Sequence, residues 1–274
     1  MNAGAHILIE KPFAQTLVEA DEILALADKK NLKIAVAHQM RLSPNIVHLK
    51  RAIGNGLIGD LVQIRSWGKQ DQRAGGEDMM VLGTHIFDIM RNFVGDPLWC
   101  SAQIWEQGRE FKKSDARKAK EDIGLIGGDE IEAQFGFANG VFATFTSRAK
   151  LGDTLGRWGI DLIGSKGTAR ILMDIFPDVY QLKSGEGKPE GKSESWARLK
   201  DDPTLNFTAE ESSVARANRR VLDDWLEAIQ KNRKPICSGH NGMKAVEMVM
   251  AVYQAGLLGK RVEFPLTDRK HPLE

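Results

Sequence analysis

The first 38 residues follow the pattern strand, helix, strand, and this pattern constrains the fold more than any other feature. Residues 5–10 are apolar on both faces, which is typical of a buried strand in a parallel sheet. A helix is predicted over 17–30, with Thr16 and Glu19 in capping-box spacing, and a second strand over 32–38. Such a β-α-β unit needs a parallel sheet with both faces covered. Because two strands and one helix cannot form a stable layer, we expect most of the parallel domain to precede this chain.

The rest of the chain has the pattern of an α+β domain. The dipeptide Asn139-Gly140 joins two alternating strands, which is the strongest short-range signal for a hairpin. We predict strands over 61–68, 98–106, 130–137, 141–148, 158–171 (a hairpin) and 179–183, a loop over 184–195, and helices over 44–55, 79–94, 210–231 and 241–258. The expected architecture is an α/β remnant over 1–40 and an α+β domain over 41–274. Its large open, mostly antiparallel sheet would carry helices on one face. The uncovered face predicts a homodimer or tetramer.

Composition excludes several classes of protein. The formal net charge is +1, and Lys and Arg are interleaved with Asp and Glu, so no nucleic-acid footprint is present. The two cysteines, Cys100 and Cys237, have no metal-ligand spacing, and we expect no metal site. No apolar run reaches the roughly 18 residues that a membrane helix needs. The first residues do not resemble a signal peptide, and we expect a cytoplasmic protein.

Charged and polar side chains follow both predicted parallel strands. Glu10 and Lys11 stand at the carboxyl end of the first strand, and in open α/β sheets ligands bind outside these ends. Pro12 would allow a cis or sharply turned bond that aims Lys11. His38 and Arg41 follow the second strand, and Arg41 suits a carboxylate, phosphate or polyol oxygen. The alternative for both segments is an ordinary surface turn.

The helix predicted over 79–94 supplies a candidate for proton transfer. His85 and Asp88 share a face opposite the apolar stripe, so Asp88 would orient the imidazole. The alternatives are an exposed helix face and a structural histidine. A glycine-containing loop precedes this helix, and a ligand can approach such a backbone closely. Arg73 and Asp78 in that loop are therefore candidate substrate ligands, although most loops of this kind simply turn.

Seven segments of the chain, taken in order, resemble the Gfo/Idh/MocA family, which includes glucose–fructose oxidoreductase and inositol dehydrogenase. They are AGAHILIEKPFAQTLVEADEILALA, QMRLSP, GLIGDLVQIRS, GTHIFDIMRNF, IGSKGTA, NRRVLDDWLEAIQKNRKPICSGHNGMKAVEMVMAVYQAG and GKRVEFPL. Each motif alone is of moderate specificity. The resemblance covers essentially the whole chain.

The resemblance implies a Rossmann domain followed by a substrate-binding and dimerisation domain. It also implies NAD or NADP as cofactor, and hydride transfer between a sugar or polyol carbon and the nicotinamide. Lys11 matches the family lysine that contacts substrate and cofactor, and His85 matches the histidine that serves many members as general acid/base. Glu10 and Arg41 match positions near the nicotinamide ribose and the site wall. Pro12 and His38 complete the expected cofactor-binding set, and Lys11, Arg73, Asp78 and His85 the substrate-binding set.

Two departures from the family pattern bear on the chemistry. Many members carry Asp four residues before the histidine, where this chain has Val81, which cannot relay a proton. Asp88 is then the better orienting partner, and Lys11 would carry more of the proton chemistry. No glycine-rich phosphate loop precedes Lys11, so most of the dinucleotide site is expected to lie upstream.

Three hypotheses follow. The first is an NAD(P)-dependent sugar or polyol oxidoreductase in N-terminally truncated form, inactive as this chain alone. The second is a non-catalytic sensor of dinucleotide or sugar on the same scaffold, with which Val81 is compatible. The third is a standalone dimerisation module. Neither the particular sugar nor the choice between NAD and NADP is encoded in the segments described above.

Overall fold

The computed structural model describes residues 1–149, 157–182, 196–199 and 213–274 of the chain. Its N-terminal part is a two-stranded parallel sheet with one crossover helix. This part consists of β1 (Ile7–Ile9), α1 (Leu17–Lys29) and β2 (Ile34–Val36). Thr16 and Glu19 form the predicted capping box, with both reciprocal hydrogen bonds present. The predicted β-α-β unit is therefore confirmed.

The first strand differs from its prediction in burial. We expected a strand buried on both faces, but Leu8 is 42% exposed, whereas β2 is buried along its whole length. The reason is that α6 (Val214–Gln230) and α7 (Gly239–Leu258) pack on β2 and cover it.

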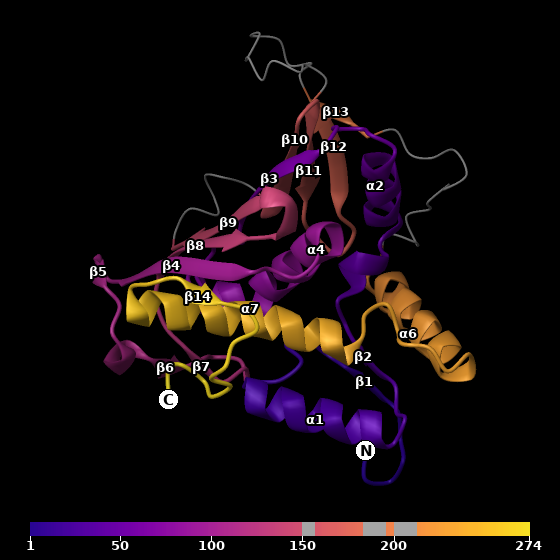
Figure 1. Cartoon of the computed structure of the whole chain (residues 1–274), viewed down its shortest axis with the longest axis horizontal. Helices are drawn as coiled ribbons and strands as arrows, with labels where there is room; N and C mark the ends of the chain where they lie inside the picture. Colours follow the sequence, from indigo (N-terminus) through magenta and orange to yellow (C-terminus); the bar gives the residue numbers. More distant parts are fainter. Residues whose placement is uncertain (150–156, 183–195, 200–212) are drawn as a thin grey trace.

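The second part is built on a 10-stranded mixed sheet (Figure 1). The strand order is β13-β12-β11-β10-β3-β9-β8-β4-β14, with β5 on β4. The strands are β3 (Leu61–Trp67), β4 (Trp99–Glu106), β5 (Arg109–Glu110), β8 (Glu130–Gly136), β9 (Phe142–Arg148), β10 (Gly159–Gly164), β11 (Gly167–Leu172), β12 (Asp178–Leu182), β13 (Trp196–Arg198) and β14 (Val262–Glu263). A separate pair joins β6 (Arg117–Lys118) to β7 (Leu125–Ile126).

Most strand pairs are antiparallel, as predicted. The β8–β9 hairpin turns through η4 (Ala138–Gly140), where Asn139 takes a left-handed φ of 61°, and β10–β11 is the second predicted hairpin. The exception is the parallel pairing of β3 with β9, which makes the sheet mixed. The loop predicted over 184–195 lies outside the described residues, as do the first residues of the helix predicted over 210–231.

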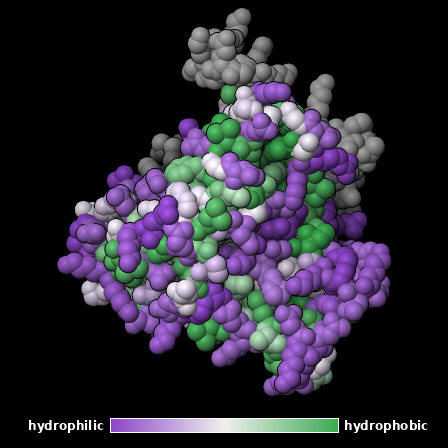
Figure 2. Space-filling view, viewed as in Figure 1, coloured by the Kyte–Doolittle hydropathy of each residue, from purple (hydrophilic) through white to green (hydrophobic). Residues whose placement is uncertain are grey.

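Helices cover one face of the large sheet (Figure 1). The segment between β2 and β3 contains η1 (Gln39–Leu42) and α2 (Pro44–Gly54). Between β3 and β4 lie α3 (Gly76–Asp78), η2 (Met79–Gly83) and α4 (Thr84–Val94), and a short turn η3 (Lys113–Asp115) follows β5. The single helix predicted over 79–94 is instead a π-helical turn, η2, that leads into α4. Around α6, hydrophilic residues dominate the surface, while apolar residues gather over the strands at the top of Figure 2.

Helix α7 ties the two parts of the chain together. It packs against β4 and α4 on the sheet side and against α1 and β2 on the other side, and most of its residues are buried. The C-terminal segment reinforces this joint. Arg269 pairs with Asp21 of α1 at 2.6 Å and with the buried Glu247 of α7 at 2.7 Å, while its carbonyl accepts a hydrogen bond from the Val18 amide.

Candidate active site

Lys11 stands just beyond the carboxyl end of β1 and reaches across to the π-helical turn. The Lys11–Pro12 peptide is cis, one of the two geometries predicted. The Lys11 Nζ donates a hydrogen bond of 3.0 Å to the carbonyl oxygen of Val81. Burial lowers the pKa of Lys11, while the carboxylates of Glu121 and Glu10 oppose that shift. Val81, whose side chain cannot relay a proton, therefore holds Lys11 through its backbone carbonyl group.

His85 lies one turn beyond that contact, at the start of α4, and it is buried rather than exposed. Its side chain is 3% exposed, and its ring meets the ring of His38 edge-on at a centroid distance of 5.3 Å. The Trp158 ring, at the start of β10, lies 6.3 Å away. Burial lowers the pKa of His85 well below its usual value, and the nearby His38 and Lys11 add to the shift. His85 is therefore neutral near pH 7 and able to accept a proton.

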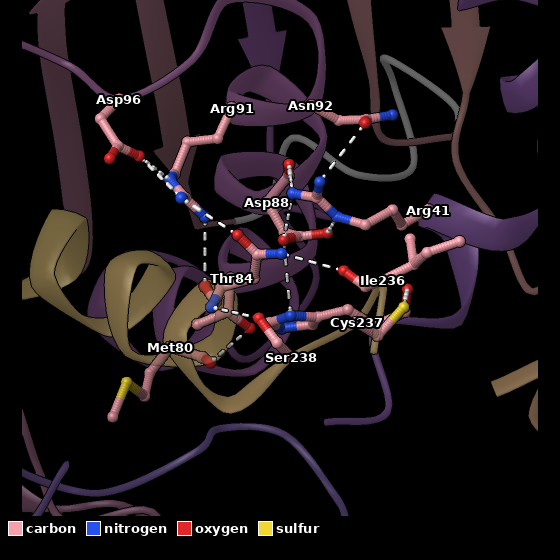
Figure 3. Close-up of polar contacts among 12 residues, drawn as sticks. Arg41, Met80, Thr84, Asp88, Arg91, Asn92, Asp96, Ile236, Cys237 and Ser238 are labelled. Carbon is pink, nitrogen blue, oxygen red and sulfur yellow. Dashed lines mark hydrogen bonds and ion pairs between the residues drawn. The ribbon is translucent and has the colours of Figure 1, made fainter. Parts of the chain in front are cut away.

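The carboxylate expected to orient His85 is bound elsewhere, and this corrects the prediction for Asp88. The Arg41 guanidinium grips Asp88 through Nε–Oδ2 (2.9 Å) and Nη2–Oδ1 (2.6 Å), and Nη2 also reaches the Asp88 carbonyl oxygen (Figure 3). The ring nitrogen that Asp88 faces is Nδ1 of His38, at 3.8 Å. The Arg41 guanidinium can bind the planar Asp88 carboxylate through two parallel hydrogen bonds, and the His85 imidazole on the same helix cannot.

The same contact corrects the role expected of Arg41. Its side chain is 10% exposed, and a third partner, Asn92, accepts from Nη1 at 3.3 Å. Burial alone would lower the pKa of Arg41, but the charge and hydrogen bonds of Asp88 raise it. Arg41 is thus a structural clasp between η1 and α4, with little capacity left for a ligand.

The segment before the π-helical turn contains two predicted substrate ligands, Asp78 and Arg73, and the structure gives them different surroundings. Asp78 is fully buried and accepts hydrogen bonds from Ser147 Oγ (2.6 Å) and from the Gln70 and Lys69 amides. Its carboxylate therefore holds the loop to β9, and the predicted substrate contact is corrected to a structural one. Arg73 is partly exposed, pairs with Asp71 at 3.0 Å, and its charge acts on Lys11.

The structure thus brings three sequence candidates together, namely Lys11, His85 and His38. Trp158 joins them. The sequence allows four tryptophans, Trp67, Trp105, Trp158 and Trp196, to line a sugar site, but core packing explains each of them equally well. Glu10 is exposed at the end of β1. A cavity of about 360 Å³ lies nearby, lined by Gln15, Thr16 and Glu121 among others, but none of the three candidates lines it.

Comparison with known proteins decides the family. Residues 50–264 match the family model described as the oxidoreductase family, C-terminal alpha/beta domain. Residues 1–38 match the model for the NAD-binding Rossmann fold of the same family. The chain belongs to the Gfo/Idh/MocA oxidoreductase family. The family resemblance stated from the motifs, and the fold class, are therefore confirmed.

This oxidoreductase aligns with about 70–75% of the length of several curated relatives, and with less than half of the length of others. D-apiose dehydrogenase of Paraburkholderia graminis is 24% identical, over 98% of this chain and 69% of the relative. The 1,5-anhydro-D-fructose reductase of Ensifer adhaerens is 24% identical, over 96% and 74%.

Solved structures show the same fold. Aldose-aldose oxidoreductase from Caulobacter crescentus, complexed with glycerol, has a TM-score of 0.71 at 20% identity, over 96% of this chain and 73% of that one. Levoglucosan dehydrogenase in complex with NADH and levoglucosan has a TM-score of 0.71 at 19% identity, over 97% and 75%. In the described parts of this oxidoreductase, no helix combines the length and apolar character that a membrane crossing requires.

The family implies a nicotinamide dinucleotide, and the residues present fit its nicotinamide end. The carboxyl ends of β1 and β2 lie at the same edge of the parallel sheet. The exposed Glu10 and the half-buried Lys11 follow β1, and His38 follows β2. Neither nitrogen of the His38 ring has a hydrogen-bond partner among the described residues. Polar groups at the carboxyl ends of parallel strands are where such ligands bind.

Proposed function

We propose that this protein is an NAD(P)-dependent oxidoreductase that moves a hydride between a hydroxyl-bearing carbon of a sugar or polyol and nicotinamide. Lys11 and His85 are the catalytic residues of this proposal. The observation that carries it is the hydrogen bond from Lys11 to the turn that begins the His85 helix, because it sets an ammonium group beside a buried neutral imidazole. The names of the relatives, which are sugar dehydrogenases and reductases, support the substrate class.

The chemistry divides between the cofactor and the chain. A bound nicotinamide supplies the hydride acceptor. The Lys11 ammonium stabilises the negative charge that develops on the hydroxyl oxygen as its proton leaves. A half-buried charge acts strongly here, because the surroundings screen it less than water would.

The hydroxyl proton goes to His85. Its lowered pKa keeps the imidazole neutral, so the ring has a nitrogen free to accept a proton in the oxidation direction. The Trp158 ring, tilted against His85 at a centroid distance of 6.3 Å, would form an apolar wall beside the reacting hydroxyl. Glu10 and Pro12 border the nicotinamide end, and Arg73 borders the substrate beside Lys11. In this proposal residues 1–40 belong to the dinucleotide domain and residues 41–274 to the substrate domain.

The test begins with binding. In the full-length protein, a thermal-shift titration with NAD(H) and NADP(H) should raise apparent stability by about 2.7 kcal/mol at one hundred times the Kd of the preferred dinucleotide. Sugars and polyols are then screened for NAD(P)H formation. Lys11→Met should lower kcat by about 10²–10³-fold, whereas Lys29→Met, an exposed lysine on α1, should leave it unchanged. Full activity in Lys11→Met would refute the assignment.

One observation favours a second candidate function, a sensor that binds dinucleotide or sugar without turnover. Val81 is buried and apolar at the position where many relatives of the family carry an aspartate. A sensor would show the thermal shift with nicotinamide cofactor and a sugar-dependent change in its Kd. It would show no NAD(P)H formation with any sugar that binds.

The proposal includes a homodimer or tetramer built through the uncovered face of the large sheet. On that face Arg170 pairs with Asp161 at 2.7 Å and stacks on the rings of Trp67 and Trp196. Flat aromatic and arginine side chains of this kind are enriched in protein interfaces. Sedimentation equilibrium decides the matter: a monomer at micromolar concentration would count against it.

A further inference from the structure

We propose that the cavity at the start of α1 is a second sugar subsite, which binds the neutral, hydroxyl-rich remainder of a substrate larger than one sugar ring, with Glu121 as its specificity-determining residue. This inference rests on the proposed function, in which the reacting hydroxyl lies at Lys11. The cavity of about 360 Å³ is lined from three segments, namely the start of α1, the β6–β7 pair and the carboxyl-terminal segment. Figure 1 shows these three segments close together.

The first support is the position of Glu121, which belongs both to the cavity and to the surroundings of Lys11. Glu121 lines the cavity, and its Oε1 lies 3.7 Å from Nη1 of Arg73. Among the carboxylates that oppose the lowering of the Lys11 pKa, Glu121 has the largest effect. The cavity and the surroundings of Lys11 therefore meet at Glu121, and a substrate that extends past the reacting carbon on this side reaches the cavity.

The second support is that the walls of the cavity are held by contacts between different elements. The Gln15 side chain donates to the carbonyl oxygen and to Oδ1 of Asp122, each at 3.4 Å, so the start of α1 is joined to the β6–β7 turn. On the carboxyl-terminal side His271 is 4% exposed, and its Nδ1 accepts a hydrogen bond from the Leu273 amide at 3.1 Å. Ligand sites are usually cavities of several hundred Å³ that are largely formed before the ligand binds.

The third support is the chemistry of the lining, which suits hydroxyl groups better than phosphate or carboxylate groups. The charged residues that line the cavity are two lysines and three acidic residues, namely Lys118, Lys120, Glu121, Asp122 and Glu274. Because the carboxylates outnumber the ammonium groups, a diphosphate or a sugar acid would meet net repulsion. A sugar hydroxyl both donates and accepts hydrogen bonds, so it can bind to carboxylate and ammonium groups alike. The lining therefore favours a neutral carbohydrate over the cofactor.

Glu121 selects the substrates that use this subsite. An ionised carboxylate only accepts hydrogen bonds, so it binds a hydroxyl group where the two sites meet and repels an acid group there. The Glu121 side chain is 52% exposed, and an ion pair as exposed as that with Arg73 contributes little, so the carboxylate can turn to a substrate at small cost. Contacts to the remote part of a substrate raise kcat when they help to align the reacting carbon. We therefore expect a larger sugar to react faster than a single ring.

The first experiment compares the best monosaccharide of the turnover screen with disaccharides that contain it, in the full-length protein. We expect kcat/KM to be higher for the best disaccharide, and the ratio of the two values to fall about tenfold or more in Glu121→Ala. The ratio is the readout because any effect of the variant on Lys11 changes both substrates alike. The matched control is Glu22→Ala, an exposed glutamate on α1, which should keep the wild-type ratio. A wild-type preference for the monosaccharide, or an unchanged ratio in Glu121→Ala, would overturn the subsite.

A second measurement does not depend on turnover. The ¹⁵N amide shifts of Ala119 and Gly124, which line the cavity, are followed while maltose, cellobiose, trehalose, glucose 6-phosphate or NAD⁺ is added. We expect a disaccharide to move both signals in the wild-type protein and much less in Glu121→Ala. No movement with any disaccharide, or a larger one with the phosphate ester or NAD⁺, would refute the subsite. Disaccharide binding in a protein that oxidises no sugar would instead count against the proposed function alone, so the two failures are distinguishable.

Discussion

Replacing Arg41 by Met should destabilise the protein far more than its place in an irregular segment suggests. The side chains of Arg41 and Asp88 are 10% and 1% exposed. Without the guanidinium, the carboxylate loses the hydrogen bonds from Nε and Nη2 and stays buried without its cation. Removing one partner of a buried ion pair costs about 3–5 kcal/mol. That is a large fraction of the roughly 5–15 kcal/mol by which domains are stable.

Urea denaturation followed by tryptophan fluorescence measures this loss directly. Arg219→Met is the matched control, because Arg219 and Asp223 form an exposed pair on α6 and should change stability by about 0.5 kcal/mol or less. In an Asp88→Asn background the Arg41→Met loss should shrink, since no buried charge is then stranded. A loss below about 1 kcal/mol in Arg41→Met would refute the clasp and return Arg41 to the ligand-binding candidates.

Three further outcomes are expected. The pKa values of His38, His85 and His271 are all lowered, mainly by burial. As the pH falls, these histidines are therefore protonated in the unfolded chain before they are protonated in the folded chain. Stability is then full above pH 6.5 and falls below it, by up to about 1.4 kcal/mol per pH unit for each histidine; urea midpoints at pH 7.5 and 5.5 should show the fall, with a smaller one in His38→Phe. Gly75→Ala should lower the free energy of unfolding by about 1–3 kcal/mol, because φ is 67° and an added methyl group would clash with the backbone between β7 and β8. An unchanged melting temperature would contradict this prediction. Tyr253→Phe should lower the free energy of unfolding by about 1–3 kcal/mol, because the buried hydroxyl accepts a hydrogen bond from the Gly127 amide at 3.2 Å. Scanning calorimetry measures this loss, and a loss below about 1 kcal/mol would contradict the prediction.

The parts of the fold that were predictable are those in which neighbouring residues decide the outcome. Asn139 and Gly140 fix the β8–β9 turn through their backbone preferences alone. Thr16 and Glu19 begin α1 by bonding to each other's backbone. The position of Lys11 beyond a strand end also followed from local pattern, because strand polarity decides which edge a residue occupies.

The contacts that define the candidate site could not be predicted in the same way. Helical spacing places Asp88 near His85, but it says nothing of a guanidinium 47 residues away that binds the carboxylate first. The pairing of His38 with His85 depends likewise on how β2 and α4 pack. The π-helical turn that presents the Val81 carbonyl to Lys11 has no signature in the sequence.

The bridge made by Arg269 has a consequence for the candidate site. Lys11 lies between β1 and α1, whereas His85 belongs to the part that packs on α7. The distance between Lys11 and His85 therefore depends on the joint that Arg269 reinforces. His271 and Leu273, close to the carboxyl terminus, are buried in the same joint. Loss of the Arg269 side chain would therefore loosen this joint, and with it the alignment of Lys11 with His85.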